Sequence, residues 1–106
     1  MLKRVKRRYL ALQIDSKEPI GSGEFMDVVW NAVKKLYGEY GASRTGLGLI
    51  DFDVERHLLV IRTAHTGVEM VRTALASITR IESRPVALHV LAVSGTIKAL
   101  YKKMKP

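Results

Sequence analysis

The chain has 106 residues, which is enough for one domain with a buried core and too few for two domains of ordinary size. Hydrophobic residues make up 47% and charged residues 26%, a balance that is typical of a folded protein and excludes a disordered tail. Eighteen Lys and Arg against ten Asp and Glu give a net charge of +8 and a pI near 10.1, which favours polyanionic partners such as nucleic acid or an anionic membrane surface.

The chain contains no cysteine, so it forms no disulfide and no thiolate zinc site, and it fits a reducing compartment. No apolar run approaches the roughly 20 residues that span a bilayer. Residues 1–8 have the charge of a signal peptide without its apolar core. We therefore expect a cytoplasmic protein.

A run of basic residues precedes the first acidic residue and leads directly into a strand. It consists of Lys3, Arg4, Lys6, Arg7 and Arg8. Alternation over residues 9–14 predicts the strand, with Leu10, Leu12 and Ile14 on one face. The basic side chains are therefore held against a rigid body.

The first helix is expected to begin with Ser22 as N-cap and to run to about Tyr40, where Gly41 stops it. Its predicted apolar face consists of Phe25, Met26, Val29, Ala32, Val33, Leu36 and Tyr40. Trp30 and Tyr37 fall near the edge of this face, where they are expected to flank the core.

An antiparallel hairpin is predicted next, with strands over 46–52 and 57–63 and a polar turn over 53–56. Thr66 and Glu69 form a capping-box pattern, which predicts a second helix ending near Ile81.

The long apolar run over 86–93 is interpreted as a strand buried on both faces in the middle of a sheet. It ends at Ser94-Gly95-Thr96, where Gly95 supplies backbone freedom and Ser94 or Thr96 caps a following helix. That helix is short and basic, with Lys98, Lys102, Lys103 and Lys105 around a stripe of Ile97, Leu100 and Met104. Helix-terminal N–H groups beside lysines predict an anion-binding corner.

The order β-α-β-β-α-β predicts an α+β protein, a ferredoxin-like or RRM-like sandwich with a short extra C-terminal basic helix, and residues 1–106 are expected to form a single domain. The first and last strands are expected on opposite edges of the sheet, so that the N-terminal run and the Ser94–Thr96 turn need not form one patch. The third strand carries no aromatic platform for stacking unpaired bases. Its apolar side chains leave surface on the open sheet face for the C-terminal helix or a partner to cover.

The sequence supports no catalytic or metal-binding residue. Asp51, Asp53, Glu55 and His57 alternate as a metal site would require, but the predicted hairpin tip breaks the alternation and places the carboxylates in water. The histidines have no paired spacing, and no serine lies in a nucleophile elbow.

Four segments together resemble archaeal ribonuclease P protein component 2, the Pop-five family. They are the Lys6-Arg7-Arg8-Tyr9-Leu10 start, the helix to Tyr40-Gly41, the strand from Gly46 to Asp53, and Leu91-Ala92-Val93-Ser94-Gly95-Thr96-Ile97-Lys98. The resemblance implies a non-catalytic subunit of the ribonucleoprotein that removes the 5′ leader from precursor tRNA. It also implies that the RNA carries the magnesium chemistry, that the protein binds no cofactor, and that protein component 3 is its partner.

The residues agree with this reading in kind, because a basic domain without stacking aromatics is expected to bind folded RNA through phosphates and shape. The candidate contacts are Lys3, Arg4, Lys6, Arg7, Arg8, Lys98, Lys102 and Lys103, with backbone N–H groups from Ser94, Gly95 and Thr96. Two alternatives stay open: a regulatory or protein-interaction domain of the same fold, and a metal-dependent nuclease acting through Asp51 and Asp53. The sequence also leaves open a homodimer or a mixed assembly.

Overall fold

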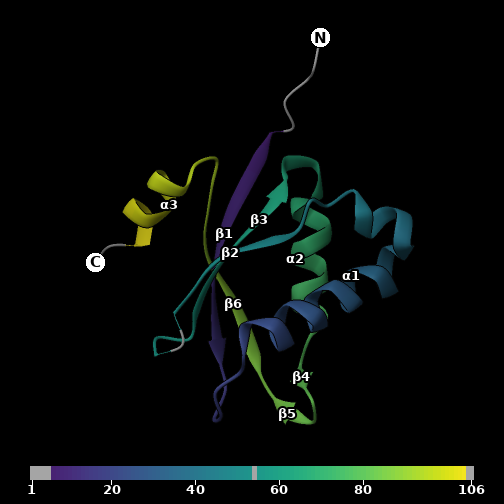
Figure 1. Cartoon of the computed structure of the whole chain (residues 1–106), viewed down its shortest axis with the longest axis vertical. Helices are drawn as coiled ribbons and strands as arrows, with labels where there is room; N and C mark the ends of the chain where they lie inside the picture. Colours follow the sequence, from purple (N-terminus) through teal and green to yellow (C-terminus); the bar gives the residue numbers. More distant parts are fainter. Residues whose placement is uncertain (1–5, 54, 105–106) are drawn as a thin grey trace.

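The computed structural model of the chain describes residues 6–53 and 55–104. Its elements are β1 (Arg7–Asp15), α1 (Ser22–Ser43), β2 (Gly48–Asp53), β3 (Leu58–Ala64), the 3-10 turn η1 (His65–Gly67), α2 (Val68–Ser77), β4 (Arg80–Ile81), β5 (Arg84–Pro85), β6 (Ala87–Ser94) and α3 (Ile97–Met104). Without the short β4–β5 hairpin and α3, the order is βαββαβ (Figure 1). The predicted ferredoxin-like fold is confirmed.

The main sheet is antiparallel, with strand order β2-β3-β1-β6. The expectation that the first and last long strands lie on opposite edges is therefore wrong, because β1 is central and pairs directly with β6. Three consecutive residues of β1, Leu10 to Leu12, are fully buried, since both edges and both faces of the strand are covered. This placement brings the start of β1, with Arg7 and Arg8, next to the end of β6.

β6 is an edge strand, so the expectation of a strand in the middle of the sheet and buried on both faces is also wrong. Its side chains alternate between exposed and half-buried positions over most of its length. The register shifts between Ala11 and Leu12 of β1, so that Leu91 of β6 faces no residue of β1. Leu91 is the bulged residue and is 48% exposed. Because most residues of β6 are apolar at exposed and half-buried positions alike, the sequence does not reveal this alternation.

The two faces of the sheet are covered unequally. Helices α1 and α2 lie on one side and α3 on the other (Figure 1). The main core joins the even-numbered face of β1 to the helices and is formed by Leu10, Leu12, Phe25, Val29, Val33, Leu59, Ile61, Val71 and Leu75. On the other side, Leu100 of α3 packs with Ala11 and Val60. The C-terminal helix thus covers part of the open face, one of the two occupants that the sequence left open.

α1 departs from the predicted helix at both ends. Gly21 occupies the N-cap position and Ser22 is the first helical residue, with no side-chain cap. Gly38 has φ 76° and ψ 173°, which kinks the helix before a last turn that continues to Ser43. Gly41 therefore does not stop it. Leu36 and Tyr40, predicted in the core, are 47% and 75% exposed because they lie at and beyond the kink.

α2 is shorter than predicted. The Thr66–Glu69 pattern forms no side-chain cap, and a 3-10 turn leads into the helix. The helix ends at Ser77, and β4 and β5 form a hairpin where the helix end and a lead-in were expected. Glu82 and Ser83 at its tip have φ 49° and 70°, the left-handed backbone of a tight hairpin turn.

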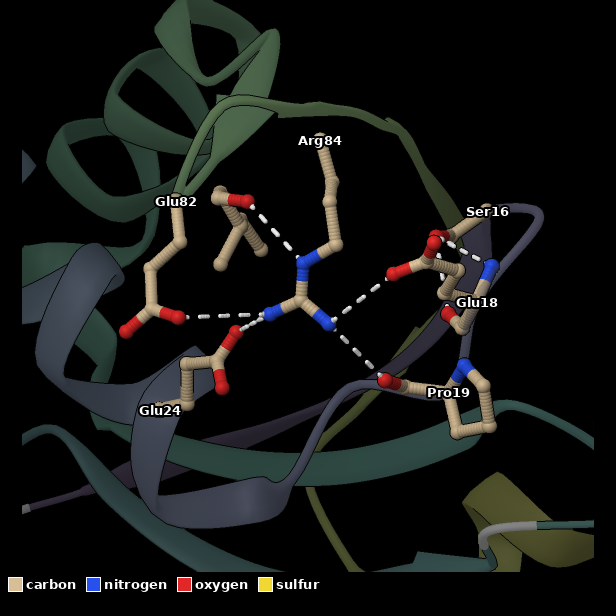
Figure 2. A network of polar contacts seen from close by, with 7 residues as sticks. Ser16, Glu18, Pro19, Glu24, Glu82 and Arg84 are labelled. Atoms are coloured by element: carbon tan, nitrogen blue, oxygen red, sulfur yellow. Dashed lines mark hydrogen bonds and ion pairs between the residues drawn. The ribbon is translucent and has the colours of Figure 1, made fainter.

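The β4–β5 hairpin is attached to the body of the protein through Arg84 (Figure 2). The Arg84 guanidinium pairs with Glu24 at the start of α1, and lies 3.8 Å from Glu18 and 3.6 Å from Glu82. It also donates hydrogen bonds to the carbonyl oxygens of Pro19 and Ile81. The Arg84 side chain is 26% exposed, and its contacts join three separate segments of the chain.

Among the described residues, no helix is long and apolar enough to cross a membrane.

Candidate nucleic-acid interface

Four segments meet at one end of the sheet, which we call the basic end: the start of β1, the end of β3, the Ser94–Thr96 turn and the start of α3. Tyr9 pairs with Ser94 of β6 and with Arg62 of β3, which sets the register of this end. The Arg8 Nη1 atom lies 3.6 Å from the position that a Cβ on Gly95 would occupy. Arg8 of the N-terminal run and the turn therefore lie in one patch, contrary to the sequence-based expectation.

The turn between β6 and α3 is organised by its own hydroxyl groups. The Thr96 hydroxyl accepts a hydrogen bond from the Ala99 amide at 3.1 Å, which confirms the predicted N-cap. The Thr96 amide points to the Ser94 hydroxyl at 3.5 Å. Gly95 does not adopt a positive φ, so the expected special backbone conformation is not used. Of the three amides expected to meet an anion, that of Thr96 thus already has an acceptor within the chain.

The lysines of α3 divide into two groups. Lys98 and Lys102 are exposed and lie one helical turn apart, on the side of α3 away from buried Leu100. Lys103 instead donates from its Nζ atom to the Val93 carbonyl of β6 at 2.7 Å. Lys103 therefore holds α3 against the edge of the sheet, while Lys98, next to the turn, belongs to the basic end.

Arg62 was not among the RNA contacts predicted from the sequence. It is the fifth residue of β3 and shares the open face with Val60, and its guanidinium lies close over Gly48 of β2. A Cβ on Gly48 would approach the Arg62 Nε atom to 2.8 Å, so the missing side chain makes room for this arginine. The period-two alternation of β3, combined with the hairpin register, was the signal that would have found it.

The basic end thus collects several of the predicted contacts. Its described cations are Lys6, Arg7, Arg8, Arg62 and Lys98. Lys3 and Arg4 lie outside the described residues. The Lys6 carbonyl accepts a hydrogen bond from the His65 amide at 2.8 Å, which fixes the backbone where β1 begins. Within the described part of the chain, none of these five cations lies within 4.0 Å of a carboxylate.

The carboxylates considered as a nuclease site have partners within the protein. Asp51 accepts a hydrogen bond from the Tyr101 hydroxyl at 2.8 Å, and Asp53 from the Arg56 amide at 3.2 Å. Burial raises the pKa of the Tyr101 hydroxyl, and the hydrogen bond to Asp51 and its negative charge raise it further. Over residues 6–53 and 55–104, no three His, Cys, Asp or Glu side chains are placed to hold one metal ion.

Comparison with known protein families shows to which family this chain belongs. The model of the Rpp14/Pop5 family matches residues 8–105, which is nearly the whole chain. The chain belongs to the Rpp14/Pop5 family. Ribonuclease P protein component 2 of Methanosarcina acetivorans is 35% identical over 100 residues, covering 94% of this chain and 74% of the relative. The protein of the same name from Thermococcus kodakarensis is also 35% identical, with 94% and 83% covered.

A solved structure shows the same fold at lower identity. A chain in the cryo-EM structure of yeast ribonuclease MRP superposes with a TM-score of 0.71 and 17% identity, covering 91% of this chain and 79% of that one. At this identity the likeness establishes the fold only. The Rpp14/Pop5 assignment rests on the sequence relatives, and it confirms the resemblance drawn from the Arg-Arg-Tyr-Leu start and the Ser-Gly-Thr-Ile-Lys turn.

Proposed function

We propose that this protein is a subunit of ribonuclease P and supports the catalytic RNA in removing the 5′ leader from precursor tRNA. The observation that carries the proposal is membership of the Rpp14/Pop5 family together with relatives named ribonuclease P protein component 2. In this role the RNA supplies the magnesium-dependent chemistry, and the protein contributes binding surface.

RNA contact is proposed at the basic end. Arg7, Arg8 and Arg62 come from the adjoining ends of two paired strands, so the sheet register fixes their backbone positions at this end, and Lys98 follows the Ser94–Thr96 turn. Arginines without internal carboxylate partners are suited to bind phosphates, because no ion pair within the protein has to break first. Such contacts position a folded RNA and are not expected to read its sequence.

The proposal also includes a protein partner, which we expect to be ribonuclease P protein component 3, as the family resemblance implies. Large apolar side chains on α1 support it, since Trp30, Leu36 and Tyr37 are each more than one third exposed and Tyr40 is 75% exposed. Four of the eight large hydrophobic side chains that are exposed among the described residues lie on this one helix, and clustered exposed apolar side chains favour a protein-interaction surface. Precursor tRNA is expected to meet this chain only within the assembled enzyme.

A drop-out reconstitution tests the proposed function. Cleavage of a precursor tRNA by ribonuclease P RNA is measured at moderate magnesium with component 3 present, and with this protein added or omitted. Accurate 5′ cleavage that requires both the RNA and this protein is the expected result. No effect of the protein would overturn the proposal in favour of a regulatory or interaction domain. Cleavage without the RNA would make Asp51 and Asp53 candidates again.

A further inference from the structure

The open face of the sheet is only partly covered by α3. The helix packs over Ala11 and Val60, near the middle of the sheet. Two residues further along β1, Gln13 lies on the same face, paired with His89 of β6 on one side and Leu58 of β3 on the other. Gln13 and His89 are both exposed, so the far half of the face presents polar side chains to solvent.

These side chains line a hollow of about 360 Å³. Its walls are Gln13, Ile14, Asp15 and Ser16 from the end of β1, Arg56 and His57 from the β2–β3 turn, and His89 from β6. The Ile14 amide donates to the His57 carbonyl at 2.9 Å, which fixes the turn against the strand. His57 has φ 56°, a backbone conformation that residues other than glycine adopt infrequently. The volume lies within the range of small-ligand sites, at its lower end.

The groups in this hollow suit a nucleobase better than a phosphate. Gln13 carries a side-chain amide that both donates and accepts hydrogen bonds, as the edge of a base does. The rings of His57 and His89 and the planar Arg56 guanidinium are of the kinds on which unpaired bases stack. The charge of Arg56 is opposed by Asp15 in the same hollow and by Asp53, whose carboxylate lies 3.8 Å from the Arg56 Nε atom.

We propose that this hollow holds the base of one unpaired RNA nucleotide, at a site separate from the basic end. It lies about 20 Å from Arg7 along β1, from the rise per residue of a strand. The inference rests on the proposed function, because it assigns a second contact to the same RNA. The two contacts differ in chemistry: the basic end binds phosphates of folded RNA, and the hollow takes a base that is free to leave a helix.

Short RNAs test the hollow directly. The full chain is titrated with the single-stranded pentanucleotides rA5, rC5, rG5 and rU5, and with an RNA duplex, while amide chemical shifts are followed. We expect at least one pentanucleotide to shift the residues of the hollow with a shallow dependence on salt, and the duplex to leave them unshifted. Gln13→Ala and His89→Ala are each expected to weaken pentanucleotide binding about fivefold or more, the loss of one base contact.

Matched controls separate the hollow from other surfaces. Asn31→Ala removes an exposed amide from α1, and Arg72→Ala removes an exposed guanidinium from α2; neither is expected to change pentanucleotide binding. Unchanged binding in Gln13→Ala and His89→Ala would overturn the inference. So would equal shifts with the duplex, or displacement of the pentanucleotide by inorganic phosphate, which would make the hollow an anion site.

The reconstitution assay distinguishes failure of the inference from failure of the proposed function. If the variants bind pentanucleotides normally while precursor cleavage still requires the protein, the hollow is not a base site and the proposed function stands. If the variants lose pentanucleotide binding but the protein has no effect on cleavage, the inference stands for a protein with another role.

Discussion

The two ends of the sheet carry opposite charge, and they differ in whether their charged side chains form ion pairs within the protein. At the basic end, Arg7, Arg8 and Arg62 have no carboxylate within 4.0 Å among the described residues. At the other end, which we call the acidic end, lie Asp15, Glu18, Glu24, Asp53, Glu55 and Glu82 together with Arg56 and Arg84. All the ion pairs among the described residues lie there.

The comparison shows how to separate structural charge from binding charge in a basic protein. Arg84 is committed to Glu24 and to two backbone carbonyls, so its charge serves to join segments of the chain (Figure 2). The cations of the basic end make no such ion pairs, and their charge is available to a ligand. A net charge of +8 alone does not distinguish the two cases. The predictions that follow disturb one end at a time.

The largest effect is expected from Leu100→Ala, which weakens the packing of α3 against the sheet and so destabilises the basic end. Leu100 is fully buried against Ala11 and Val60, so the substitution leaves a cavity and is expected to lower the free energy of unfolding by about 2–5 kcal/mol. Urea denaturation measures the change. Leu91→Ala, at a 48% exposed leucine, is the control and is expected to cost less than about 1 kcal/mol. Equal losses in the two variants would mean that α3 does not anchor this end.

The second prediction removes the binding charge itself. A triple variant, with Arg7, Arg8 and Arg62 each replaced by alanine, is expected to bind ribonuclease P RNA more weakly. The slope of log affinity against log salt concentration should also become shallower by about 2 to 3, because each lost phosphate contact contributes about 0.7–0.9 to that slope.

A matched triple variant carries the same loss of charge on the helices, at Lys34, Lys35 and Arg72, and is expected to keep the parent slope. Filter binding over a range of salt concentrations compares the two. Identical slopes in both variants would place the phosphate contacts elsewhere.

The third prediction disturbs the acidic end. Arg84→Ala removes hydrogen bonds to a carboxylate and two carbonyls, and is expected to lower the free energy of unfolding by about 1–3 kcal/mol. Arg84→Lys restores the charge but not the fork of donors, so partial recovery is expected. Arg80→Ala, at an exposed arginine of the same hairpin, is the control. RNA affinity at the salt of the assay should change little in any of the three, and a large loss would break the division between the ends.

The smallest effect is expected at Tyr101, between the two ends. The raised pKa of Tyr101 means that the folded state favours the neutral hydroxyl. The stability that Tyr101 contributes is therefore fully present below the pKa of the unfolded chain, about 10. It is lost as the pH rises through the pKa of the folded protein. Tyr101→Phe is expected to cost about 0.5–1.5 kcal/mol at neutral pH, or less because the side chain is partly exposed. Denaturation at neutral and alkaline pH measures the difference between the two proteins. A difference that grows at alkaline pH would contradict the hydrogen bond to Asp51.

The sequence predicted what depends on local pattern. The apolar face of β1 and the Thr96 cap follow from short-range rules and are found in the structure. The β4–β5 hairpin was missed because Glu82 and Ser83 adopt left-handed backbone without the glycine or asparagine that usually signals it. β6 was misread because apolar residues, Ala87 and Leu91, occupy two of its three exposed positions as well as the half-buried ones.

The site was harder to predict than the fold because it depends on sheet order. The basic run and the Ser94–Thr96 turn are each visible in the sequence, but only the pairing of Tyr9 with Ser94 makes them neighbours. Arg62 joins them through a second register, that of β1 with β3. The hollow around Gln13 needs three elements that are distant in the chain, so no single stretch of sequence indicates it.

The central position of β1 also has a consequence for how the protein is made. β1 precedes the other described strands and pairs with the last long strand, so one of its two edges has no partner until Ser94 has been synthesised. Contacts between residues so far apart in the chain are slow to form. Until then, an apolar strand and a cluster of arginines are exposed together in the nascent chain, where RNA is abundant.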